Sequence, residues 1–159
     1  MKEKTTTSPK RRCAECGGTG FSRRTREQKY KIDDTTFRIT VPMDQCAKCG
    51  EGYLAGPDLQ AAALRVAQRV IEAGMVSGGS FRFLRHALRL QGAGIAKLLE
   101  VTPETISRWE TGKYEVDRFA WVLLAEMVLD EVAGRNTTRD RLEALHHPTE
   151  LPKSVRVEP

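Results

Sequence analysis

The spacing of the four cysteines constrains the fold of this chain more than any other feature of its sequence. Cys13 and Cys16 form one Cys-x-x-Cys pair, and Cys46 and Cys49 form a second. A gap of two residues lets both thiolates of a pair face one ion, and two such pairs complete the tetrahedral shell of zinc. The sequence therefore predicts a single metal site with four thiolate ligands.

Glycine follows the second cysteine of each pair, at Gly17 and Gly50, which suits a tight knuckle whose backbone N–H groups turn toward the sulfurs. Disulfides, a redox dithiol and buried thiols are the alternatives. A cytosolic chain disfavours structural disulfides, and a redox motif needs one Cys-x-x-Cys and not two. We therefore predict one zinc ion per chain. It is structural and not catalytic, because four thiolates leave no open position for water.

The loop between the two cysteine pairs has the pattern of a small sheet. Residues 37–41 alternate apolar and polar side chains, as a half-buried strand does, and Tyr30 and Ile32 precede them. Asp33-Asp34 is the predicted turn between two strands. A unit of this size has too little core to fold alone, so we expect loss of the metal to unfold it.

A helix is predicted after the second cysteine pair, starting at Gly56-Pro57-Asp58 and ending near Gly74. Its apolar residues form a helical stripe that consists of Leu59, Ala62, Ala63, Val66, Val70 and Ile71. It either packs on its own domain or links two domains. The stretch Ser77-Gly78-Gly79-Ser80 is predicted to be a flexible joint and the domain boundary.

A short helix is predicted between Val101 and Lys113. Thr102 provides an N-cap hydroxyl and Pro103 suits the first helical position. Gly112 stands where a residue with a left-handed conformation commonly ends a helix.

The outer surface of this short helix is polar. Ile106 and Trp109 lie three residues apart and face inward. Four residues remain on the outer surface: Glu104, Thr105, Ser107 and Arg108. A helix of this kind is suited to probe the major groove of DNA.

Further helices are predicted on both sides of it. Apolar residues recur at helical spacing after Phe81 and again after Ile95, and a longer helix is predicted from Asp117 to about Val132. Apolar residues cover much of the circumference of that last helix: Phe119, Val122, Leu123, Met127, Val128 and Leu129. So wide an apolar face indicates a homodimer contact.

Composition limits the class of protein. Hydrophobic residues make up 40% of the 159, and no apolar run is long enough to span a membrane. The N-terminus, MKEKTTTSPKRR, is charged and lacks the apolar segment of a signal peptide, so we expect a soluble, cytoplasmic protein. The net charge of +5 permits a nucleic-acid partner without proving one. The basic residues near the N-terminus form either a solvated surface or a site for phosphate or an acidic partner.

These patterns predict an α+β chain, with a small zinc-bound β-rich N-terminal domain and an all-α helix-turn-helix C-terminal domain. The predicted divisions are a basic disordered tail (1–12), a zinc-binding domain (13–56), a linker helix with a flexible joint (57–79), a DNA-binding and dimerisation domain (80–134) and a C-terminal extension (135–159). The extension is expected to hold one short helix around residues 139–145. His146 and His147 are predicted to be surface residues, because no further ligand lies near them in the sequence.

Residues 95–113 resemble the helix-turn-helix of the Cro/C1 (Xre) regulators. The small residue at Ala96, the aliphatic residue at Val101 and the SRWExGK ending are characteristic of that family, whereas Glu100 stands at a turn position that usually holds glycine. The resemblance implies contacts with bases at the positions of Thr102, Pro103, Glu104 and Arg108. Arg108 is the strongest candidate, because arginine can grip guanine through two bonds. Thr105 and Ser107 are secondary candidates, and Lys113 is a candidate for contact with the DNA backbone.

The combination of a four-cysteine head and a Cro/C1-like tail is similar to the MqsA family of antitoxins, whose head is a YgiT-type zinc finger. The match runs from about Cys13 to Val132 and includes the Cys-x-x-Cys-Gly-Glu ending at Cys46–Glu51. The resemblance implies that the zinc head engages a toxin that cleaves mRNA. It also implies that the tail dimerises and represses the shared operon at a palindromic site on double-stranded DNA.

Three other functions are weighed against this hypothesis. A solitary zinc-stabilised regulator would use its head for another protein partner or an effector. A zinc hydrolase or nuclease is disfavoured, because the sequence has no His-Glu-x-x-His motif, no Ser/His/Asp grouping and no carboxylate pair beside an open metal position. A structural adaptor is disfavoured by the polar outer surface of the helix that follows Thr102. We therefore expect a protein that is not an enzyme.

Overall fold

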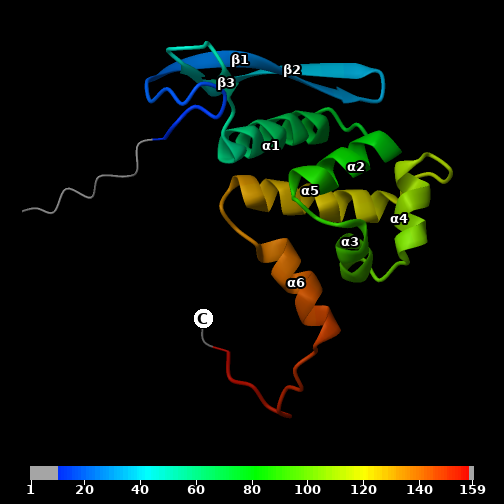
Figure 1. Ribbon diagram of the computed structural model, residues 1–159. Coiled ribbons are helices and arrows are strands. Elements are labelled where there is room, and N and C mark those ends of the chain that lie inside the picture. Colours follow the sequence, from blue (N-terminus) through cyan, green and yellow to red (C-terminus); the bar gives the residue numbers. More distant parts are fainter. Residues whose placement is uncertain (1–10, 158–159) are drawn as a thin grey trace, which may run out of the picture. The chain divides into compact units, whose positions relative to one another are not determined.

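The computed structural model describes residues 11–157 and divides into two compact units, one that runs through Ala63 and one that starts at Leu64. An antiparallel sheet lies in the first unit, and six helices follow along the described chain (Figure 1). The predicted α+β class is confirmed in this respect.

The first unit is dominated by a long hairpin. Strands β1 (Phe21–Ile32) and β2 (Thr35–Cys46) are antiparallel, and the short strand β3 (Gly52–Tyr53) pairs with the end of β2. The predicted turn between the strands is confirmed, and Asp33 has a φ of 50°, a left-handed conformation that aspartate tolerates better than most residues. The hairpin is longer than the alternation in residues 37–41 indicated, because charged side chains pair across its exposed positions.

The two faces of the hairpin differ in chemistry. Ile32 and Val41 are buried, and Val41 lies on the same face of β2 as Phe37 and Ile39. On the opposite face, Arg38 donates to the carboxylate of Glu27 at 3.0 Å. The part of the first face nearest the turn is therefore mainly apolar, and the opposite face is polar and charged.

Helix α1 (Gly56–Glu72) has the predicted bounds, and Gly74 follows it with a φ of 63°. Its buried residues are Ala62, Val66, Ala67 and Val70, which belong to the predicted stripe or adjoin it. The division between the two units falls within α1, between Ala63 and Leu64, and not at the predicted boundary.

Residues 77–80, which the sequence suggested as a flexible joint, instead start helix α2 (Gly78–Ala87). Ser77 is the N-cap, and its side chain and that of Ser80 form a reciprocal capping box. Ser80 is fully buried and accepts a hydrogen bond from Trp121 Nε1 at 3.1 Å. A side chain at Gly78 would lie 2.2 Å from the carbonyl oxygen of Trp109. The glycine therefore allows close packing of backbone on backbone.

The second unit continues with α3 (Gly92–Leu98), α4 (Pro103–Glu110), α5 (Arg118–Val132) and α6 (Thr137–His146). Helix α2 packs against α4 and α5, α3 packs against α4, and α6 packs against α5 and α3 (Figure 1). The largest fully buried side chains of this unit are Phe81, Leu84, Ile95, Ile106, Leu124, Val70 and Val128. The rings of Phe81 and Trp109 meet edge to face, with their centres 5.6 Å apart.

A buried ion pair joins α2 to α4. Arg85 Nε and Nη2 lie 2.6 and 2.9 Å from the two carboxylate oxygens of Glu110, and the two side chains are 9% and 11% exposed. Arg85 Nη1 also donates to the carbonyl oxygen of Leu90 at 2.7 Å. The two charges are thus paired and hydrogen-bonded, as buried charges must be if they are to be tolerated.

Helix α6 lies outside residues 80–134, the predicted DNA-binding domain. It is longer than the helix predicted around residues 139–145. The Asp130 carboxylate accepts hydrogen bonds from the backbone N–H and hydroxyl of Thr138, at 2.7 and 2.8 Å, and these fix the start of α6. His147 is exposed, as predicted, but His146 is half-buried and its Nδ1 lies 3.6 Å from the Glu100 carboxylate. Glu100 has a φ of 53°, the left-handed conformation that explains why glycine is usual there.

None of the helices within residues 11–157 combines the length and the apolar character that crossing a membrane requires.

The buried ion pair gives a test of the packing of α4. Replacing Arg85 or Glu110 with alanine should destabilise the protein by about 3–5 kcal/mol, because the remaining charge is left buried without its partner. Chemical denaturation followed by circular dichroism measures the change. The matched control is Arg69→Ala, which breaks the exposed pair of Arg69 with Glu72 and should cost less than about 1 kcal/mol. A loss from Arg69→Ala as large as that from Arg85→Ala or Glu110→Ala would contradict this role of the buried pair.

Candidate metal centre and nucleic-acid interface

The four cysteines converge on one point of the first unit. All four Sγ atoms lie within 4.8 Å of one another, and two of the separations are 3.5 Å (Cys13 to Cys49) and 3.6 Å (Cys16 to Cys46). Four sulfurs bound to one zinc ion in a tetrahedron lie about 3.8 Å apart, from a Zn–S length of about 2.3 Å. The donor set and its spacing therefore fit a thiolate-bound metal ion and are consistent with zinc.

Each cysteine pair lies on a knuckle of the predicted kind. Gly17 N–H donates to the Cys13 carbonyl oxygen and Gly50 N–H to the Cys46 carbonyl oxygen, both at 2.9 Å. The two glycines have φ values of 69° and 80°, which residues with a Cβ rarely adopt. Hydrogen bonds from the N–H groups of Cys49 and Lys48 lower the pKa of Cys46. The backbone thus favours the ionised sulfur that binds a metal.

Tyr53 on β3 is a neighbour of the cluster that the sequence did not indicate. Its hydroxyl lies 3.1 Å from Cys13 Sγ and accepts a hydrogen bond from the Ala14 N–H at 3.0 Å. The Tyr53 hydroxyl, helped by the N–H groups of Cys16 and Glu15, lowers the pKa of Cys13 to about 6. An aromatic residue just after the second Cys-x-x-Cys was the available signal, but its contact with Cys13 depends on how the two knuckles meet.

Crowding of the sulfurs has the opposite effect on Cys49. The Glu51 N–H favours its thiolate, but the neighbouring sulfurs of Cys16, Cys13 and Cys46, together with burial, raise the pKa of Cys49 to about 12. Four negative charges this close repel one another, so full ionisation needs a cation at the centre. A metal ion at the centre of the cluster would offset this repulsion and displace the remaining thiol protons.

Arg11 lies beside the cluster and not in a disordered tail. The predicted tail was 1–12, and residues 1–10 lie outside the described part of the chain. Arg11 stacks over the rings of Phe21 and Tyr53, with its Cζ 5.1 and 4.8 Å from their centres, and its Nη1 lies 2.9 Å from Asp44. Asp44 also binds Arg23, and this contact lowers the pKa of its carboxyl group.

The second candidate site is the outer surface of α4. The Thr102 hydroxyl accepts a hydrogen bond from the Thr105 N–H at 3.2 Å, and Pro103 occupies the first turn, as predicted. Ile106 and Trp109 are buried and fix the inner surface of the helix. The predicted polar residues lie outside: Thr102, Glu104, Ser107, Arg108 and Lys113 are exposed, and Thr105 is half-buried.

Glu104 is held as a carboxylate at the start of α4. Its own backbone N–H and the Thr102 hydroxyl lower the pKa of its carboxyl group, and the charge of Arg108 contributes. The outer surface of α4 therefore carries a fixed negative charge at its N-terminal end and a positive charge one turn later. A carboxylate can accept a hydrogen bond from the amino group of cytosine, and arginine can donate two to guanine.

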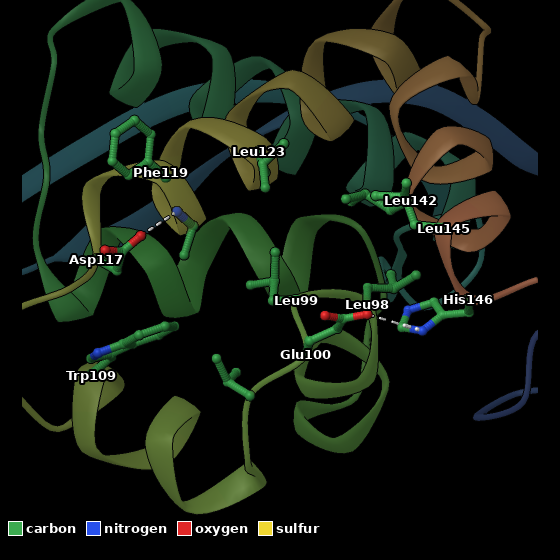
Figure 2. Close-up of a pocket in the computed structure, with 12 residues that line it drawn as sticks. Leu98, Leu99, Glu100, Trp109, Asp117, Phe119, Leu123, Leu142, Leu145 and His146 are labelled. Carbon is green, nitrogen blue, oxygen red and sulfur yellow. Dashed lines mark hydrogen bonds and ion pairs between the residues drawn. The ribbon is translucent and has the colours of Figure 1, made fainter. Parts of the chain in front are cut away.

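An apolar groove of about 460 Å³ lies on another part of the second unit (Figure 2). Trp109 lies at one end of it, and Leu142 and Leu145 of α6 lie at the other. Phe119 is 82% exposed and Val122 is 50% exposed, so part of the wide apolar face of α5 remains open. Met127 and Val128 are buried within the unit, so core packing explains their place in the pattern, whereas Leu123 and Leu129 are half-buried.

The metal cluster can be tested directly in the whole protein. Cys46→Ser should remove stoichiometric metal binding and unfold the first unit, while the helices that follow α1 remain, because their core contains no cysteine. Metal analysis by mass spectrometry and two-dimensional NMR measure the two effects. Glu15→Gln, which alters a residue between the cysteines of one pair, is the control and should keep the metal. Loss of both units together in Cys46→Ser would contradict their independence.

Comparison with known proteins shows a family that shares both the four-cysteine segment and the segment of α4. A family model described as the antitoxin component of a bacterial toxin-antitoxin system, MqsA, matches residues 11–131. The matched segment contains all four cysteines and the whole of α4, and it stops before α6. A search of curated proteins found no match.

Proposed function

The chain belongs to the MqsA family of antitoxin components, and on this premise we propose that it neutralises a toxin through its metal-binding unit and represses its own operon through α4. One observation carries the proposal: the family match spans both the four-cysteine cluster and the helix with the polar outer surface. The metal is zinc, one ion per chain, held by Cys13, Cys16, Cys46 and Cys49. It has a structural role, since the four thiolates fill its coordination shell.

The repressor role rests on the geometry of α4. Ile106, Trp109 and the Glu110–Arg85 pair hold the helix from its inner side, so its outer surface is rigid and free to enter a major groove. Arg108 reads a guanine, and Glu104, Thr105 and Ser107 contact neighbouring base edges. Thr102 contacts a base edge at the start of the helix. Lys113, which lies just beyond the end of the helix, contacts the DNA backbone.

A homodimer fits this mode of recognition. Two copies related by a two-fold axis present two α4 helices, and such a dimer reads a palindromic operator. The exposed Phe119 and Val122 on α5 supply apolar surface for the contact between copies. Residues 80–134 form the DNA-binding and dimerisation domain in this proposal, and residues 13–56 form the zinc domain that engages the toxin.

The toxin partner is proposed to be an mRNA-cleaving ribonuclease that contacts the zinc domain. Strand β1 lies at the edge of the sheet among the described residues, and its outer edge carries backbone groups that no other strand of the sheet engages. A strand of a partner can add to such an edge, and the charged face of the hairpin provides side chains for selectivity. In this proposal the protein acts by binding and is not an enzyme.

The role of Arg108 is tested by its replacement with alanine. Arg108→Ala should weaken binding to the DNA upstream of the chain's own reading frame by roughly 1–3 kcal/mol, because a guanine contact is lost. Fluorescence anisotropy with purified protein measures the affinity. Arg141→Ala removes the same charge from an exposed position on α6 and is the matched control. Equal weakening by the two variants would show that Arg108 contributes only charge.

Two variants should separate the two roles in cells. Cys46→Ser should lose protection against the co-expressed toxin, because the unit that binds it unfolds. Arg108→Ala should keep protection but lose repression of a reporter placed behind its own promoter. Growth and reporter output are the measurements. Protection that survives Cys46→Ser would contradict the assignment of the toxin-binding surface to the zinc domain. Absence of a small ribonuclease-like frame next to this one would favour a solitary regulator.

A further inference from the structure

The proposed function leaves an aromatic side chain beside α4 without a role. Tyr114 follows the helix and is 54% exposed. The Cζ atom of Arg108 lies over its ring, 5.5 Å from the ring centre. A guanidinium at this distance from an aromatic face is attracted by the electron density of the ring. The residue that reads guanine in the proposed function therefore rests on Tyr114.

The backbone creates this contact. Gly112 has a φ of 71°, and the N–H groups of Gly112 and Lys113 donate to the carbonyl oxygens of Trp109 and Arg108, at 3.0 and 2.9 Å. These two bonds form a Schellman motif, which reverses the chain at the end of a helix. The Tyr114 N–H then donates to the Arg108 carbonyl oxygen at 3.2 Å. Hydrogen bonds from three consecutive N–H groups, those of Gly112, Lys113 and Tyr114, thus place the ring beside Arg108.

The stack matters because an exposed arginine side chain is otherwise free to adopt many rotamers. Ordering such a side chain when it binds DNA costs conformational entropy, and restraint before binding reduces that cost. An aromatic ring covers one flat face of the guanidinium, while the N–H donors lie at its edges. The stack therefore restrains Arg108 without using the donors that guanine needs.

We propose that Tyr114 is a positioning residue for base reading, which holds the guanidinium of Arg108 ready to bind guanine through its free edges. This role rests on the proposed DNA-binding function. It belongs to the ring of Tyr114 and not to its hydroxyl, because the stack needs only a π face. Tyr114 acts through Arg108, so its loss has no further effect once Arg108 is absent.

The test uses full-length protein and a DNA duplex from upstream of its reading frame, together with duplexes in which each guanine is replaced in turn. Tyr114→Leu keeps an apolar side chain but removes the π face, and it should weaken operator binding about two- to fivefold. The preference for guanine at the Arg108 position should fall by the same factor, with unchanged affinity for unrelated DNA. Tyr114→Phe keeps the stack and should bind as the wild type does. In the Arg108→Ala background, Tyr114→Leu should change nothing.

Unchanged operator affinity in Tyr114→Leu would overturn the proposal. So would equal weakening on operator and unrelated DNA, a Tyr114→Phe variant as weak as Tyr114→Leu, or a further loss in the Arg108→Ala background. A ring-current shift of the Arg108 side-chain protons, lost in Tyr114→Leu, reports the stack in the free protein by NMR. A wild type that shows this shift but does not prefer its own operator would overturn the proposed function itself, and with it the role of Tyr114. The two failures are thus distinguishable.

Discussion

The contact of helix α4 with helix α2 is the constraint on which the polar outer surface of α4 depends. Helix α4 has eight residues, too few for a helix to be stable alone in water. Its inner side is fixed by buried Ile106 and Trp109, and its end is fixed by the Glu110 carboxylate on Arg85. Because these contacts hold one side of α4 against the core, the polar residues on its other side face solvent. The direction in which the polar surface of α4 faces is thus a consequence of packing.

The metal-binding unit solves a different physical problem. The described part of this unit buries few large apolar side chains, chiefly Ile32 and Val41, and the other residues of the hairpin strands, apart from Cys46, are half-buried or exposed. A metal ion held by the four sulfurs would supply the cross-link that such a small core cannot. The Tyr53 hydroxyl and the stacked Arg11 then surround the cluster. In such a unit, an entire strand and a charged face remain available to bind a partner.

Features that depend on neighbours in the sequence could be predicted from it. The cysteine spacing indicated the cluster, Thr102 and Gly112 marked the two ends of α4, and the aspartates between the strands marked the hairpin turn. The Arg85–Glu110 pair and the Tyr53–Cys13 contact join residues 25 and 40 positions apart, and no local pattern reveals them. The prediction of a flexible joint at 77–80 was wrong for the same reason. Its composition is that of a linker, but the capping box and the buried Trp121–Ser80 bond make it a helix start.

We propose that one short chain joins a toxin-binding metal unit to a sequence-specific DNA reader, and this proposal depends most on the reading of DNA sequence. Its most direct test is a titration of the purified zinc-loaded protein with its own upstream duplex, and with a scrambled duplex of equal length and composition, over a range of salt concentrations. Contacts with phosphate weaken with salt on both duplexes, whereas base reading acts on only one of them. We expect the upstream duplex to bind at least about 10³-fold more tightly than the scrambled duplex at physiological salt. Equal affinities that fall together as salt rises would contradict it, since the basic charge alone would then explain the binding.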